Sequence, residues 1–135
     1  MRTALISVYN KEGVVDFAKQ LAGLNFRILA SGGTAKVLTE AGIDVTDTAS
    51  LVGGAILGHR VVTLSREIHA GLLAQDTQSD RNELQSLNIP RLDLVCVDLY
   101  PLEQEIIKPG STLASVIEKT DIGGPTLLRS AAKGR

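Results

Sequence analysis

The sequence predicts an α/β domain with a mainly parallel central sheet and helices on both of its faces. Up to Thr46, short apolar segments alternate with segments whose apolar residues recur at helical spacing, in the order strand, helix, strand, helix, strand. This order favours right-handed crossovers between parallel strands. A length of 135 residues suits one domain with one hydrophobic core.

The first half of the chain gives the clearest element boundaries. Residues 3–9 and 26–30 form short apolar runs of the kind found in buried parallel strands. A helix is predicted from Val14, because apolar residues follow it at helical spacing. A second helix over residues 35–41 ends at Gly42, a residue type that favours the helix C-terminus. A brief third strand is predicted over residues 43–46.

The middle of the chain is less regular. Three glycines between residues 49 and 59 predict a loop with at most one helical turn, and residues 60–64 are predicted to be extended near the site. Ser65 is placed to cap a helix that continues through Ile68 and Leu72. A short exposed helix is predicted over residues 81–87, after a polar turn.

The last third contains the strongest strand pattern, over residues 92–100, which is predicted to lie at the centre of the sheet. Pro101 is placed to start a short helix. Ser111 precedes another helix, over residues 113–119. The closing helix carries Pro125 near its start. Its predicted buried face consists of Leu127, Leu128, Ala131 and Ala132.

Composition excludes several classes of function. With 14 Lys and Arg against 15 Asp and Glu, the net charge of −1 does not suggest a nucleic-acid or membrane partner. Cys96 is the only cysteine, so no internal disulfide can form, and this suits a reducing cytoplasm. No apolar run approaches the ~20 residues that span a membrane, and no signal peptide is expected at Met1. His59 and His69 lack metal-ligand spacing.

Two glycine-rich segments, residues 29–34 and 121–126, each place a polar residue and paired glycines before a predicted helix. Backbone N–H groups at a helix start favour an anion. Lys11, Ser31 and Thr34 would add donors and positive charge around Gly32 and Gly33. Glycine turns after strands are also common for structural reasons, and the residues alone leave both interpretations open. The spacing fits neither a Walker loop nor a dinucleotide fingerprint.

Four further polar residues could contribute to the chemistry, and two of them, Asp121 and Lys133, have structural alternatives. Asp98 and Tyr100 would share one face of a regular strand. Asp121 can either accept hydrogen bonds from a ligand or cap the last helix. Lys133, late in that helix, is typical of a solvent-exposed residue that complements the helix dipole.

Five segments together resemble the IMP cyclohydrolase family, the N-terminal domain of the bifunctional purine biosynthesis proteins. These segments are residues 6–11, 30–36, 98–101, 121–125 and 127–133. The resemblance extends over nearly the whole chain. It implies a three-layer domain with the methylglyoxal-synthase-like fold over residues 1–135, shortened at its C-terminus and without the transformylase domain.

The resemblance also implies a reaction and its residues. The family closes the purine ring of 5-formamidoimidazole-4-carboxamide ribonucleotide, giving IMP and water in de novo purine synthesis, and needs no metal or organic cofactor. It implies proton transfer by Lys133, with Tyr100 and Asp121 orienting and polarising the substrate. The residues it implies for substrate binding are Tyr9, Asn10, Lys11, Ser31, Gly32, Gly33, Thr34, Arg60, Val61, Val62, Thr63, Val97, Asp98, Asp121 and Ile122.

One departure from the family pattern bears on activity. The family usually reads Arg-Val-Lys-Thr-Leu-His-Pro where this chain has residues 60–66, so Val62 replaces a lysine and Ser65-Arg66 replaces the His-Pro pair. Loss of one positioned cation can cost roughly 3 kcal/mol, or about a hundredfold in rate. The alternative to an active IMP cyclohydrolase is therefore a module that binds the nucleotide without turnover. Methylglyoxal synthase is a further alternative, which residues 31–34 and 121–125 disfavour. The residues neither favour nor exclude a homodimer.

Overall fold

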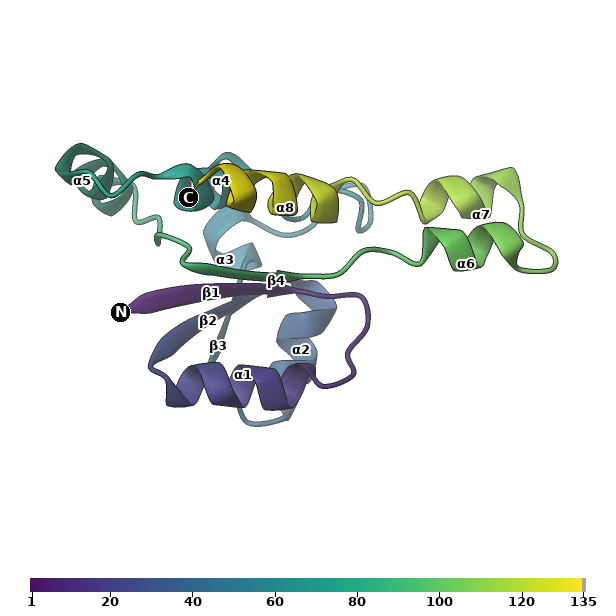
Figure 1. The fold of residues 1–135 in the computed structure, drawn as a ribbon, viewed down its shortest axis with the longest axis horizontal. Helices are drawn as coiled ribbons and strands as arrows, with labels where there is room; N and C mark the ends of the chain where they lie inside the picture. Colours follow the sequence, from purple (N-terminus) through teal and green to yellow (C-terminus); the bar gives the residue numbers. More distant parts are fainter. Residues whose placement is uncertain (135) are drawn as a thin grey trace.

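The computed structural model describes residues 1–134 and contains a four-stranded sheet between two layers of helices (Figure 1). The strands are β1 (Arg2–Ser7), β2 (Phe26–Ala30), β3 (Val45–Asp47) and β4 (Leu94–Val97). All pairs are parallel, and the strand order is β3-β2-β1-β4. The predicted fold class is confirmed.

The first layer of helices consists of α1 (Val14–Gly23) and α2 (Gly32–Glu40). In β1, Ala4 and Ile6 point toward this layer and pack with Val14, Ala18 and Leu38. Side chains of a strand alternate between the two faces of its sheet. Leu5, which lies between them, therefore points to the opposite layer. Burial on both faces explains why the sequence of β1 is an uninterrupted apolar run.

The second layer consists of α3 (Ala49–Val52), α4 (Arg66–Leu73) and α8 (Gly123–Lys133). Leu5 of β1 and Leu29 of β2 pack here with Ile68, Leu72 and Leu127. Ser65 begins α4 as predicted, since its side chain accepts a hydrogen bond of 3.1 Å from the amide of Ile68. Each face of the sheet is thus buried by its own hydrophobic cluster.

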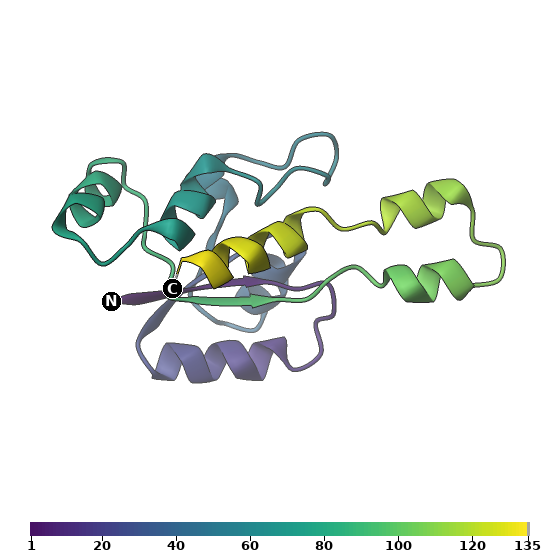
Figure 2. The same cartoon turned by 45° about the horizontal axis from the view of Figure 1, so that its top comes forward.

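Three further helices lie outside these layers. The first is α5 (Gln78–Ser86), which begins earlier than predicted because the Thr77 side chain caps it. The others, α6 (Leu102–Ile107) and α7 (Leu113–Glu118), form a helical hairpin that extends beyond the end of the sheet (Figures 1 and 2). The side chain of Thr112 caps α7.

Two predictions about the last third of the chain were wrong. The segment 92–100 forms a strand of only four residues, β4, and it lies at the edge of the sheet rather than at the centre. The apolar residues of this segment indicated a strand covered by helices on both faces. They carry no information about whether that strand lies at the centre or at the edge of the sheet. In α8, Leu128 and Ala132 are exposed, because the helix turns Gly124 and Leu127 toward the sheet. No helix within residues 1–134 has the length and hydropathy required to cross a bilayer.

Candidate active site

A cavity of about 930 Å³ opens beyond the carboxyl ends of β1, β2 and β4. Ligands of open α/β sheets bind at this position. Most of the residues implied for binding and catalysis line it: Tyr9, Lys11, Ser31, Gly32, Gly33, Thr34, Arg60, Val62, Thr63, Asp98, Tyr100, Asp121 and Ile122. Both glycine-rich segments therefore face one cavity.

The first glycine-rich segment is anchored to the end of β1. Ser31 Oγ lies 2.8 Å from Ser7 Oγ. Thr34 Oγ1 donates to the Val8 carbonyl at 3.1 Å and accepts from the Val8 amide at 3.3 Å. Thr34 is only 2% exposed, so its hydroxyl holds the start of α2 in place.

The paired glycines belong to the first turn of α2 rather than to a turn before it. Gly32 has a φ of +42°, which L side chains rarely adopt. A Cβ on Gly33 would lie 3.9 Å from Lys11 Cε, so the lysine side chain lies beside the start of the helix. Its ammonium donates to the carbonyls of Val8 and Tyr9. A helix N-terminus with an adjacent lysine suits a phosphate.

Asp98, directly after β4, fixes the loop that follows β1. Its carboxylate accepts from the backbone amides of Tyr9 and Asn10, the second at 2.8 Å. Because both of its oxygens are engaged, Asp98 ties two strand ends together at the cavity floor. The β4 ladder ends at Val97, so Asp98 and Tyr100 do not continue the strand that the sequence predicts.

Asp121 joins the two chain segments of the opposite wall. One oxygen accepts from the amide of Gly124 at 3.0 Å, and the other accepts from the amide of Tyr100 at 3.3 Å. The capping role considered from the sequence is therefore present. A Cβ on Gly124 would lie 2.8 Å from Asp121 Oδ2 and 2.7 Å from Leu99 Cδ2, so a larger residue here would displace these side chains.

The ring of Tyr100 packs edge-on against that of Tyr9, with centroids 5.5 Å apart and an interplanar angle of 81°. Burial raises the pKa of the Tyr100 phenol above its usual value, and the negative charge of Asp121 raises it further. The phenol is consequently protonated at neutral pH. Its hydroxyl can donate a hydrogen bond inside the cavity.

Residues 60–64 form an irregular segment that closes the cavity from the side of α4. Its only ladder contact is a bridge between Ile56 and Val61. Thr63 is buried, and a Cβ on Gly123 would lie 3.1 Å from its hydroxyl, so Thr63 contacts the start of α8. Val62 places an apolar side chain in the cavity wall.

The hairpin and neighbouring loops bring to the cavity several polar residues that the sequence patterns did not indicate. His59 Nε2 lies 2.6 Å from Glu118 Oε1. The ammonium of Lys119 lies over the Tyr9 and Tyr100 rings. The only available signal for Lys119 was its place two residues before Asp121. In residues 1–134, no group of three or more potential metal ligands is arranged to hold a metal ion.

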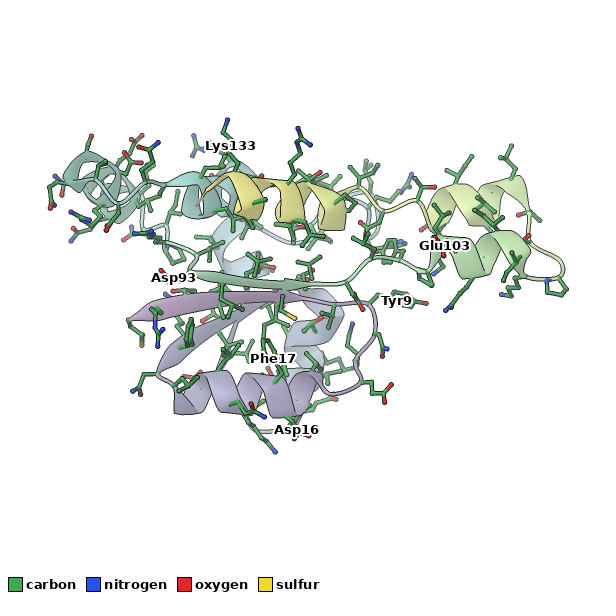
Figure 3. The ribbon with its side chains drawn as sticks, in the orientation of Figure 1. Tyr9, Asp16, Phe17, Asp93, Glu103 and Lys133 are labelled. Atoms are coloured by element: carbon green, nitrogen blue, oxygen red, sulfur yellow. The ribbon has the colours of Figure 1, made fainter. Side chains whose placement is uncertain are left out.

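Four predicted residues do not line this cavity: Asn10, Val61, Val97 and Lys133. Lys133 is exposed on the last turn of α8, well apart from Tyr9 (Figure 3). At 1.5 Å per residue, it lies about 15 Å along the helix from Gly123. It instead borders a second cavity of about 460 Å³ together with Arg91 and Asp93.

Comparison with known families identifies the fold family. The family model of the MGS-like domain matches residues 13–126. The chain belongs to the MGS-like domain family. This match, together with the similar proteins described next, confirms the family resemblance inferred from the sequence.

Similar proteins of this MGS-like family include three bifunctional purine biosynthesis proteins PurH. The identity is 49% over 135 residues with that of Synechocystis sp., 52% over 135 residues with that of Synechococcus elongatus, and 49% over 134 residues with that of Anoxybacillus flavithermus. Each match covers 98% of this chain and 26% of the relative. The chain therefore spans about a quarter of the length of these proteins.

A solved structure supports the same placement within the MGS-like family. The crystal structure of ForH superimposes with a TM-score of 0.83 at 40% sequence identity. The match covers 98% of this chain and 67% of the ForH chain.

Proposed function

We propose that the chain is an IMP cyclohydrolase, which closes 5-formamidoimidazole-4-carboxamide ribonucleotide to IMP and water. The similarity to PurH supports a purine ribonucleotide as the substrate class. The observation that carries the proposal is the convergence of two glycine-led helix starts and the Tyr100 phenol on one cavity. The cavity gives the phosphate and the reacting groups opposite walls.

The phosphate end of the ligand is assigned to the start of α2. Exposed Gly32 and Gly33 let a phosphate approach the backbone N–H groups, and Lys11 supplies positive charge beside them. The ribose and the ring would then extend toward the wall formed by Tyr100 and Asp121. This orientation uses the polar groups of both walls.

Ring closure requires an amide nitrogen, a poor nucleophile, to attack the formyl carbon. As the new nitrogen–carbon bond forms, the formyl oxygen takes a proton from the Tyr100 phenol, and the phenolate regains a proton from the attacking nitrogen. The resulting hydroxyl then leaves as water together with the proton of the former formamide nitrogen, and a carbon–nitrogen double bond forms in its place. The cavity contributes orientation, and Tyr100 contributes the proton and charge stabilisation at the formyl oxygen.

The proton-transfer role that the resemblance implies for Lys133 stays a prediction, because this residue lies outside the cavity. Its test is Lys133→Ala. A loss of turnover larger than the loss of IMP affinity supports the role. Unchanged turnover contradicts it and leaves proton transfer to Tyr100.

The proposed activity is tested by incubating the purified chain with the formylated ribonucleotide and recording the purine absorbance of IMP. We expect closure faster than the spontaneous reaction, and Tyr100→Phe is expected to lower it about a hundredfold. IMP affinity should change little, because the phosphate wall is intact. Failure to bind either IMP or the substrate would contradict the assignment of the cavity.

A binding module without turnover is the second candidate, and the position of Val62 in the cavity wall favours it. Binding of IMP without any rate above the spontaneous reaction would establish this function. Val62→Lys separates the two candidates further. A gain of about a hundredfold in rate would show that this chain lacks a cation that the reaction uses. An unchanged rate would show that position 62 is dispensable.

A further inference from the structure

Lys119 directly follows α7 and points its ammonium into the cavity. The Nζ atom lies 5.0 Å from the centroid of the Tyr9 ring and 5.5 Å from that of the Tyr100 ring. A cation within about 6 Å of an aromatic face is attracted by the negative charge of that face. One lysine therefore contacts both aromatic rings of the site.

The other charged groups at this wall are already engaged. Glu118 is paired with His59, and Asp121 binds the amides of Tyr100 and Gly124. No carboxylate among residues 1–134 lies within ion-pair distance of the Lys119 ammonium, so its charge is directed at the rings.

The remaining cations of the cavity are engaged elsewhere. The ammonium of Lys11 donates to backbone carbonyls near the start of α2, and Arg60 Nε donates to the Leu57 carbonyl at 3.0 Å. Val62 carries no charge. Lys119 is thus the lysine of this chain that lies at the Tyr100 wall.

We propose that Lys119 is a positioning residue that acts through Tyr100, supplying at this wall the positive charge that Val62 cannot. This inference rests on the proposed cyclohydrolase function. When Tyr100 gives its proton to the formyl oxygen, negative charge develops on the phenolate. The nearby ammonium stabilises that charge until the attacking nitrogen returns a proton.

The composition of the chain gives a direct test that needs no substrate. Tyr9 and Tyr100 are its only tyrosines, and it contains no tryptophan. The ultraviolet absorbance of tyrosinate therefore reports these two side chains alone. Tyr9→Phe leaves only Tyr100 in the titration, and the variants of Lys119 are best compared in that background.

The direction of the titration shift follows from the charges that face Tyr100. Asp121, Glu118 and Tyr9 raise the pKa of the phenol, whereas Lys119 lowers it. Lys119→Gln should therefore move the titration of Tyr100 to higher pH, and Lys119→Arg should keep it near that of the parent. Lys108→Gln is the matched control, because Lys108 holds the corresponding position after α6 and pairs with Glu105 instead. It should leave the titration unchanged.

The second readout is turnover of the full chain with native Tyr9. Lys119→Gln should lower turnover about tenfold, because one cation beside a developing charge is lost. The affinity for IMP should stay within about threefold of that of the parent. Lys119→Arg should recover most of the rate. An unmoved Tyr100 titration, or unchanged turnover despite a shifted titration, would overturn the inference. A parent chain without turnover would contradict the proposed function, whereas the titration would still decide whether Lys119 acts on Tyr100.

Discussion

The two walls of the cavity are built in different ways. The wall formed by β1, β2 and α2 is continuous with the buried core: Ile28 is 1% exposed, and Thr34 is fixed to Val8 by two hydrogen bonds. The opposite wall, with Tyr100 and Lys119, stands at the base of the α6–α7 hairpin, which extends away from the sheet (Figure 2).

The hairpin has little core of its own. Its helices have six residues each, and Ile107 and Leu113 are 81% and 78% exposed. Segments with few buried apolar contacts open at lower free energy than core strands. The hairpin wall is therefore expected to be less stable than the sheet wall, so the proposed phosphate site and the proposed reacting groups would lie on walls of different stability.

The largest expected difference between the walls is in stability. Ile28→Ala should destabilise the fold by about 2–5 kcal/mol, because it opens a cavity between β2 and the first helix layer. The same substitution at Ile107 should change the free energy of unfolding by under ~0.5 kcal/mol. Urea denaturation of both variants makes the comparison. Equal losses would show that the hairpin is packed as firmly as the sheet.

The next largest effect is expected at the hairpin wall, in turnover. Asp121→Asn replaces one carboxylate oxygen by a donor, so one of the two backbone amides that it holds, those of Tyr100 and Gly124, loses its acceptor. Turnover of the formylated ribonucleotide should fall about a hundredfold, with IMP affinity within about threefold. Steady-state kinetics and IMP titration measure the two quantities. Parallel losses in both would indicate that Asp121 serves binding instead.

Thr34→Val tests the phosphate wall. Valine keeps the volume of Thr34 but leaves the Val8 amide and carbonyl without this hydroxyl, at a cost of about 1–3 kcal/mol in the free energy of unfolding. IMP affinity should fall with it, because the start of α2 is released. Thr39→Val, on an exposed position of the same helix, is the control and should cost under ~0.5 kcal/mol. Similar values for the two variants would contradict the anchoring role.

The smallest expected effect concerns alkaline pH. Burial raises the pKa of the Cys96 thiol from 9.0, and the charge of Asp98 adds to the shift. Stability from the neutral thiol is therefore complete below the ordinary thiol pKa and is lost as the pH rises through the higher folded pKa. Cys96→Ala should flatten the decline of stability above about pH 9, measured as urea midpoints against pH. An unchanged slope would assign the decline to other groups, with Tyr100 the first candidate.

The sequence alone determined the types and order of most elements. Apolar runs without alternation indicated strands covered on both faces, as in β1 and β2, and Ser65 marked the start of α4 through its cap. These features were predictable because they depend on local spacing and on hydrogen bonds between near neighbours. The glycine-rich segments also indicated where backbone could approach a ligand.

Which residues come into contact could be seen only in the folded structure. In the fold, β4 lies at the sheet edge, and Lys133 lies about one helix length from the cavity. The ammonium of Lys119 lies over the two tyrosine rings. Each of these outcomes depends on packing between segments far apart in the sequence, such as the loop after β1 and the end of the hairpin. A pattern read along one chain segment carries no information about such contacts, because they are fixed by how whole elements fill space against each other.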